Sequence, residues 1–283
     1  MTTEKFQAVN RDSRVPAKLE DLANSIQRNC TISDARFAGF YSLCILILRL
    51  RNLYKWEKGL EPWSEPDTPV LMEWVDAREK LWESLFDEPF QSLDYNGQVL
   101  DPLEGSAVNQ WFSGSGLLYG AGYGRSLKPI FFLADKKEER KVEGIPLFIL
   151  GKEQARELAA PFAMNQEEII YIRREPLRFH LWDQIQEIPY TGKKTLLHAL
   201  KFYQVLNKDG EIDQSRLIHN FDRMVDTELE TFVYHEIGEI QEDMITSSVS
   251  RQIINAFPHS PIEFLSRAVR DLLADTNRSG LLS

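Results

Sequence analysis

The apolar pattern changes twice along the chain, and this change constrains the fold more than any single motif. In the first third of the chain apolar residues recur at helical spacing, most clearly over residues 70–86. Between residues 111 and 173 they instead form short runs separated by glycines and charged turns, which is typical of strands. Helical spacing returns after Pro176. The sequence therefore predicts an α+β fold, predominantly α-helical, with N-terminal and C-terminal helical parts flanking a small antiparallel β-sheet.

Individual elements follow from the same spacing. Strands are expected at residues 129–133, 145–150 and 168–173, with a short helix at 151–160. Helices are expected at residues 17–28, 33–58, 70–86, 177–186, 194–206 and 215–245, the last either continuous or broken near Asp226. The expected domains are residues 1–180, containing the first helices and the sheet, and residues 181–283, a helical domain. Their boundary falls between residues 175 and 190.

The last helix has the clearest start in the sequence. Ser260, Pro261 and Glu263 supply an N-cap, a first-turn proline and a carboxylate at the third helical position. The following apolar residues fall on one helical face, which we expect to pack on the core. That expected core face consists of Leu265, Ala268, Val269, Leu272 and Leu273.

Composition restricts the classes of function. Hydrophobic residues at 43% and charged residues at 27% are ordinary for a globular protein. A formal charge of −10 argues against a general nucleic-acid binder, which needs a basic surface. The longest apolar run is too short to span a membrane, and the first residues lack the apolar core of a signal peptide. Two cysteines make no disulfide framework, so we expect a cytoplasmic protein.

The main candidate site lies in residues 228–243, which contain His235-Glu236-Ile237-Gly238-Glu239. This resembles the zinc-binding pattern H-E-x-x-H, but glutamate replaces the second histidine. On a helix His235 and Glu239 share a face, so they are expected to bind one metal ion. Glu228 and Glu242 lie seven residues to either side of His235, along nearly the same stripe, and either is expected to be a supplementary ligand.

Further residues are expected to complete or support this centre. All five histidines lie in the last 104 residues, and imidazole is a common transition-metal ligand. His198, His219 and His259 are therefore candidate ligands from other segments. Glu236 falls on the apolar side of the helix, where a carboxylate is a candidate acid or base, here a general base or support for the ligands. Iron, zinc and manganese all suit such mixed nitrogen and oxygen ligands. The leading hypothesis is a cytosolic metal-binding protein, with a metal-dependent hydrolase or oxidoreductase as the corresponding enzyme.

The alternative is a non-catalytic interaction protein whose acidic helix binds a basic protein partner. Eleven acidic residues but only Arg216 and Arg223 occur between Asp209 and Asp243. Such a density of like charge repels itself unless a cation or a partner neutralises it. A solvated polar helix face accounts for the same pattern with no ligand at all.

A third hypothesis is an enzyme that binds a small anionic ligand. Arg173, Arg174 and Arg178 form a cationic cluster beside apolar sequence, and converging guanidinium groups bind carboxylate or phosphate. A solvated turn, or pairing with the acidic residues downstream, is the favoured explanation of the same cluster. The glycine-rich residues 111–128 offer a second place, where Arg125 or Lys128 would assist. Neither the Walker nor the dinucleotide-binding spacing is present there, and a glycine-rich hairpin explains the segment as well.

Overall fold

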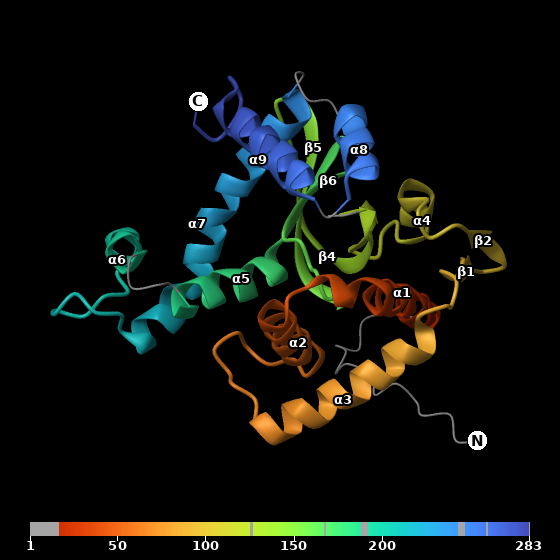
Figure 1. Cartoon of the computed structure of the whole chain (residues 1–283), viewed down its shortest axis with the longest axis horizontal. Coiled ribbons are helices and arrows are strands. Elements are labelled where there is room, and N and C mark those ends of the chain that lie inside the picture. Colours follow the sequence, from red (N-terminus) through yellow and green to blue (C-terminus); the bar gives the residue numbers. More distant parts are fainter. Residues whose placement is uncertain are drawn as a thin grey trace. The chain divides into compact units, whose positions relative to one another are not determined.

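The computed structural model describes residues 17–124, 127–166, 168–187, 192–242, 247–258 and 260–282 (Figure 1). Helices form most of this part of the chain, and strands form two sheets, so the mixed, mainly helical α+β class is confirmed. The chain divides into two compact units. The first comprises Met1–Gly122, Pro129–Ala134 and Glu153–Ala160; the second comprises Tyr123–Lys128, Asp135–Lys152 and Pro161–Ser283.

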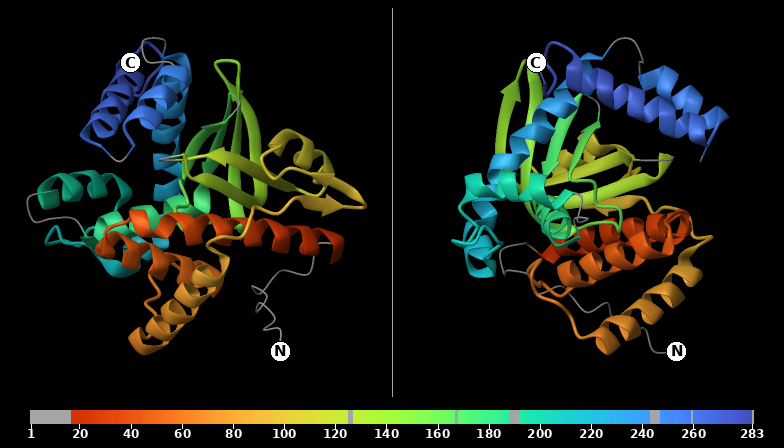
Figure 2. Two further views of the ribbon diagram at one scale, coloured as in Figure 1. Left: turned by 45° about the vertical axis from the view of Figure 1, so that its right-hand side comes forward. Right: turned by 60° about the vertical axis from the view of Figure 1, so that its left-hand side comes forward.

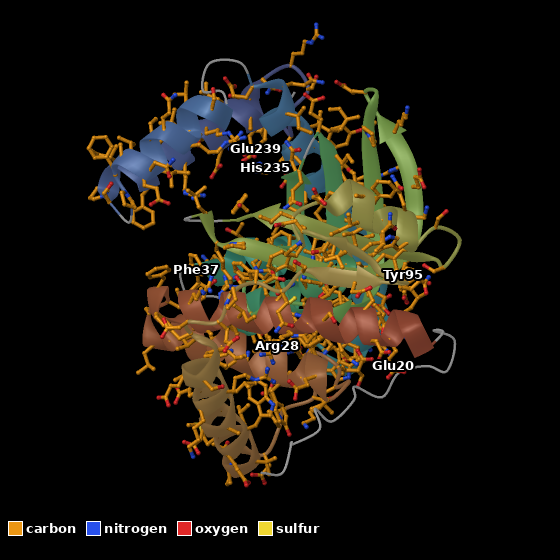
Figure 3. The ribbon with its side chains drawn as sticks, turned by 90° about the vertical axis from the view of Figure 1, so that its right-hand side faces the viewer. Glu20, Arg28, Phe37, Tyr95, His235 and Glu239 are labelled. Carbon is orange, nitrogen blue, oxygen red and sulfur yellow. The ribbon has the colours of Figure 1, made fainter. Side chains whose placement is uncertain are left out.

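The first unit is built around its N-terminal helix. Its elements are α1 (Ala17–Phe37), a 3-10 turn (Ala38–Phe40), α2 (Leu43–Glu57), α3 (Thr68–Leu85), β1 (Leu93–Tyr95), β2 (Gln98–Leu100) and α4 (Gly105–Trp111). Helix α1 packs against α3 and β1, and Glu20, Arg28 and Phe37 mark its length in Figure 3. Its buried face, with Leu22 and Ile26, belongs to a core that also contains Phe131 and Leu133.

The expected helix at residues 33–58 is wrong in its boundaries. Helix α1 continues to Phe37, and α2 begins only at Leu43, after the turn that contains Gly39. The helix expected at residues 70–86 is confirmed as α3, because its regular i, i+3, i+4 spacing runs without interruption. Proline in its first turn and Asp67 before it fit a helix start.

The main sheet is neither small nor antiparallel throughout. Its strands are β3 (Leu117–Tyr123), β4 (Pro129–Val142), β5 (Ile145–Ala155), β6 (Ala163–Gln166) and β7 (Ile169–Arg173). Their order is β3-β4-β5-β7-β6, in which β5 pairs with β7 in parallel and β6 pairs with β7 antiparallel. The fold is thus corrected to a five-stranded mixed sheet with a separate two-stranded antiparallel ribbon, β1-β2.

Long strands replace two of the expected loops and helices. The charged residues after Leu133 extend β4 to Val142, and β5 continues to Ala155 where a short helix at 151–160 was expected. Glu143 and Gly144 both have positive φ, 50° and 84°, which is the geometry of a tight two-residue turn between strands. The turn therefore consists of Glu143 and Gly144 alone, and the charged residues before it belong to β4.

Glycines before and within β3 have packing and turn roles. Gly114 and Gly116 adopt φ values of 77° and 76°, which ordinary residues seldom adopt. A Cβ at Gly120 would lie 2.0 Å from the ring of Phe132, so the absence of a side chain lets that ring pack on the strand. Gly114, Gly116 and Gly120 therefore have structural roles in a turn and in packing.

The second unit has a long central helix. Its helices are α5 (Arg174–Glu187), α6 (Lys193–Leu200), a 3-10 turn (Lys201–Tyr203), α7 (Gln214–Gln241), α8 (Ser247–Ala256) and α9 (Pro261–Thr276). Helix α7 packs against α5, α9, β6 and β7, and the strands beside it are visible in Figure 2. Asp213 caps its first turn by accepting from the Arg216 backbone N–H. Helix α7 is continuous through Asp226, so the alternative with a break there is wrong.

Helix α9 begins at the expected residue, but the face that it buries is not the expected apolar face. The Ser260 side chain accepts from the Glu263 backbone N–H, which confirms the cap. Glu263 and Ala274 are the buried positions, whereas Leu265 and Leu272 are among the most exposed apolar side chains described. The predicted core face of this helix is therefore wrong. No helix in the described ranges combines the length and apolar character needed to cross a membrane.

Candidate metal centre

Helices α7 and α9 approach each other closely because Gly238 has no side chain. A Cβ at Gly238 would lie 2.1 Å from the Ala274 carbonyl oxygen, closer than any real contact. The Asn277 side-chain amide donates to the Gly238 carbonyl at 2.8 Å and fixes the end of α9 against α7. Small residues at this crossing therefore bring the polar side chains on either side of it within reach of one another.

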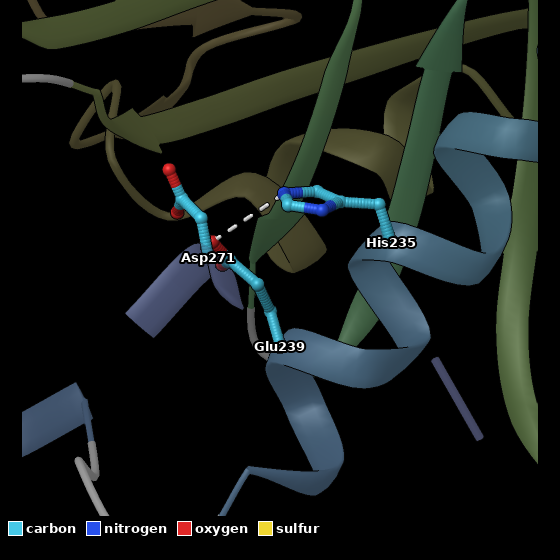
Figure 4. A group of neighbouring side chains, drawn as sticks. All are labelled: His235, Glu239 and Asp271. Carbon is cyan, nitrogen blue, oxygen red and sulfur yellow. Dashed lines mark ion pairs between the residues drawn. The ribbon is translucent and has the colours of Figure 1, made fainter. Parts of the chain in front are cut away.

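Three of those side chains form a potential metal-binding group. Within the described residues, His235 and Glu239 of α7 and Asp271 of α9 each offer a ligand atom, and these atoms lie within 4.8 Å of one another (Figure 4). Asp271 is exposed, and the other two are partly buried. The predicted pair His235 and Glu239 thus shares one helix face, with His235 Nε2 lying 3.8 Å from Glu239 Oε1.

The carboxylate of Asp275 contacts the His235 ring from the side away from Glu239. His235 Nδ1 lies 2.8 Å from Asp275 Oδ1, so Asp275 engages one ring nitrogen while the other faces Glu239. Metal-binding histidines commonly donate their second nitrogen to a carboxylate in this way, which fixes the ring and its tautomer. Glu239 is itself held, because its Oε2 lies 3.2 Å from Arg270 Nη2.

Glu236, next to His235 along α7, is buried. Burial, the negative charge of Glu239 and that of Asp271 raise the pKa of Glu236 to about 8, against the opposing effect of Arg270. The carboxyl group is therefore largely protonated at neutral pH. A carboxyl group with this pKa can give up or accept a proton near neutrality, which suits a general acid or base.

Other predicted ligands lie elsewhere. Glu228 accepts a hydrogen bond from the Tyr203 hydroxyl. Burial, and next this hydrogen bond, raise the pKa of Tyr203. His198 is exposed and packs its ring edge-on to Phe202, 5.9 Å between centroids. His219 is exposed on α7, sixteen residues before His235. None of these belongs to the described three-residue group, and neither does Glu242, at the C-terminal end of α7. His259 lies outside the described residues.

The arginine cluster is engaged by acidic residues of α7. Arg174 Nε lies 2.5 Å from Asp226, and Arg178 Nε lies 3.0 Å from Asp222. Burial lowers the pKa of Arg174, but Asp226 and Asp222 outweigh it and raise that pKa overall. Arg173 is fully buried at the end of β7. Arg125 lies outside the described residues.

The same pairs neutralise much of the acidic helix. Besides Asp222 and Asp226, Glu230 pairs with Arg140 of β4, and Glu239 pairs with Arg270. From the sequence alone the negative charge of α7 was unbalanced, which favoured an external cation or a basic partner. Arginines from β4, α5 and α9 thus pair with four acidic residues of α7 within the second unit, and the geometric support for a metal comes from His235, Glu239 and Asp271.

Comparison with known families covers nearly the whole chain. The model of the N-terminal domain of a family of unknown function, DUF6866, matches residues 21–173, more than half of the chain. The chain belongs to the DUF6866 family. The model of the DUF6866 C-terminal domain matches residues 178–283, which include His235, Glu239 and Asp271. Searches of curated proteins and of solved structures found no match.

Two residues of α9 at the site, Asp271 and Asp275, were not predicted from the sequence. Asp271 and Asp275 are four residues apart, the spacing of neighbours on one helix face, and this was the available signal. The apolar residues of α9 favour a core face on the opposite side of the helix, which the structure leaves exposed. The polar face, with Arg270 and Ala274, is the one that meets α7.

Proposed function

We propose that the chain is a metal-binding protein, in which His235, Glu239 and Asp271 bind one divalent transition metal ion, iron, zinc or manganese. The observation that carries the proposal is the convergence of these three side chains from α7 and α9, with Asp275 on the far nitrogen of the imidazole. One nitrogen and two carboxylate oxygens suit all three metals.

The geometry requires only side-chain movement. Two ligands at about 2.1 Å from a tetrahedral ion are roughly 3.4 Å apart. The Nε2–Oε1 separation of 3.8 Å between His235 and Glu239 is close to this value. The spread of 4.8 Å across the group would contract by about 1.4 Å on binding. Asp271 is exposed and can change rotamer without disturbing the core.

The proposed chemistry is that of a metal with positions left for water or a small-molecule ligand. Catalytic zinc sites typically use three protein ligands and bind water at the fourth position. Glu236 would be the nearby group that accepts or supplies a proton, because it is buried next to the ligand residues. The corresponding enzyme would be a metal-dependent hydrolase or oxidoreductase. The proposed location of the protein is the cytosol.

Thermal unfolding with added metal tests the proposal. A ligand present at 100 times its dissociation constant stabilises a folded protein by about 2.7 kcal/mol. We therefore expect Zn²⁺ or Mn²⁺ to raise the melting temperature of the chelator-treated chain by several degrees. The His235→Ala variant should lose this shift.

The control is His219→Ala, which removes an exposed histidine from the same helix but outside the group. This variant should keep the full metal-dependent shift. An equal shift in His235→Ala and the unmodified chain would contradict the proposal, since the metal would then bind elsewhere. No shift with Zn²⁺, Mn²⁺ or Fe²⁺ would contradict it as well.

A further inference from the structure

Arg270 of α9 places a positive charge beside the three proposed metal ligands. Its Nη2 lies 3.2 Å from Oε2 of Glu239, whereas the other oxygen of that carboxylate, Oε1, lies 3.8 Å from His235 Nε2. Arg270 directly precedes Asp271 in the chain. The guanidinium is therefore separated from the proposed metal position by the width of one carboxylate group.

The Arg270 guanidinium also has a donor to spare. Among the residues that the structure describes, no acceptor lies within hydrogen-bond reach of the buried Nε, although the side chain as a whole is 20% exposed. A buried donor without an acceptor costs free energy, so this Nε–H favours a ligand that brings an oxygen, and the partial exposure lets such a ligand reach it. Arg28 and Arg49 also have a buried Nε of this kind. Arg270 differs from them because it contacts a proposed metal ligand.

We propose that the metal centre binds a small molecule through an oxyanion group, a carboxylate or a phosphate, with one oxygen on the metal and another on Arg270. This inference rests on the metal-binding function proposed above. The Glu239 carboxylate supplies the geometric argument, since one of its oxygens faces the metal position and the other contacts Arg270. An oxyanion group has a similar pair of oxygens and can span the same two positive groups. Three protein ligands leave a position on the metal for it.

The charges of the group favour an anion over a neutral ligand. A divalent ion offsets the negative charges of Glu239 and Asp271. In the same sum the charge of Arg270 offsets that of Asp275, which contacts the His235 ring at 2.8 Å. An open position on the metal and the Nε–H of Arg270 then remain, and both attract a negatively charged oxygen. A hydroxyl or amide oxygen carries no net charge and gains less from these two groups.

Thermal unfolding of the metal-loaded chain tests this inference. The chain is loaded with whichever of Zn²⁺, Mn²⁺ and Fe²⁺ it binds, freed of excess metal, and titrated separately with acetate and with inorganic phosphate at constant ionic strength. The dependence of the melting temperature on anion concentration gives a dissociation constant for each anion. We expect at least one anion to bind, and to bind the metal-free chain more weakly. Arg270→Gln should raise its dissociation constant about 10–100-fold, the contribution of a charge-assisted hydrogen bond.

The control is Arg267→Gln, which removes a second arginine from the same helix. Arg267 is 32% exposed, pairs with Glu263 and lies outside the metal-binding group, so its replacement should leave the anion affinity unchanged. If Arg270→Gln no longer holds the metal, Arg270→Lys takes its place, because lysine keeps a positive charge beside Glu239. A lysine ammonium lacks the planar fork of a guanidinium, so Arg270→Lys should still bind the anion more weakly than the unmodified chain.

The outcomes separate this inference from the metal-binding proposal. A chain that binds none of the three metals overturns both. A chain that binds a metal but neither anion overturns only the oxyanion inference. Equal anion affinity after Arg270 is replaced, or equal affinity with and without the metal, overturns it as well. An equal loss of anion binding in Arg267→Gln would do the same, because the anion would then respond to the general charge of α9.

Discussion

Replacing Glu236 by glutamine should stabilise the metal-free chain. Glutamine keeps the size of the side chain but never ionises, so the cost of a buried charge disappears. Glu236 is buried in α7, and burial together with Glu239 and Asp271 raises its pKa to about 8 from an ordinary value of 4.5. Between these two values the folded chain retains a proton that the unfolded chain has lost.

The sign and the magnitude follow from this difference. Folding then requires proton uptake, so the stability of the unmodified chain falls as the pH rises from 4.5 towards 8. Each pKa unit corresponds to about 1.36 kcal/mol. The advantage of Glu236→Gln should therefore be about 1 kcal/mol at pH 5, about 3 at pH 7 and about 5 at pH 9.

Urea denaturation followed by circular dichroism at these three pH values measures the difference. The control is Glu211→Gln, an exposed glutamate before α7, which should change stability by less than about 0.5 kcal/mol at any pH. A difference between Glu236→Gln and the unmodified chain that stays constant with pH would refute the reasoning, because no proton would then be coupled to folding at Glu236.

Two further predictions concern the α7–α9 crossing and the histidine ring. Gly238→Ala should destabilise the chain by about 1–3 kcal/mol, because its Cβ meets the Ala274 carbonyl oxygen at 2.1 Å and the helices must separate. Gly39→Ala, where a Cβ meets nothing within 4 Å, is the control and should be neutral or slightly stabilising in urea denaturation. Asp275→Asn should weaken Zn²⁺ binding about 10–100-fold in a calorimetric titration, because the ring of His235 loses its carboxylate partner. Unchanged affinity would show that Asp275 does not support a metal ligand.

Helix and strand positions were predicted correctly where the spacing of apolar residues or a helix cap was clear within the element itself. Residues 70–86 kept helical spacing throughout and form α3. Ser260, Pro261 and Glu263 specify a helix start through contacts within one turn, and α9 begins there. Residues 169–173 form β7, close to the expected strand at 168–173. In each case neighbouring residues suffice to determine the structure.

Predictions failed where contacts distant in sequence decide the structure. The charged half of β4 and residues 151–155 of β5 lack a strong strand pattern, yet both continue the sheet. Pairing of β5 with the distant β7 in parallel could not be anticipated from turn residues, which indicate only hairpins. The sheet was therefore expected to be smaller and antiparallel.

The candidate site shows the same limit. His235 and Glu239 were predicted together because four residues along a helix place them on one face. Asp271 and Asp275 required knowledge of which face of α9 meets α7, and the small residues Gly238 and Ala274 decide that orientation. Apolar spacing alone favoured the opposite face, which the structure leaves exposed.

Metal content is the most direct measurement of the central claim. Untagged chain, desalted after purification, would be measured by elemental analysis beside the His235→Ala and His219→Ala variants. We expect close to one iron, zinc or manganese per chain in the unmodified protein and in His219→Ala, and a loss of that metal in His235→Ala. Metal absent from all three proteins, or retained in His235→Ala, would contradict a metal centre at His235, Glu239 and Asp271.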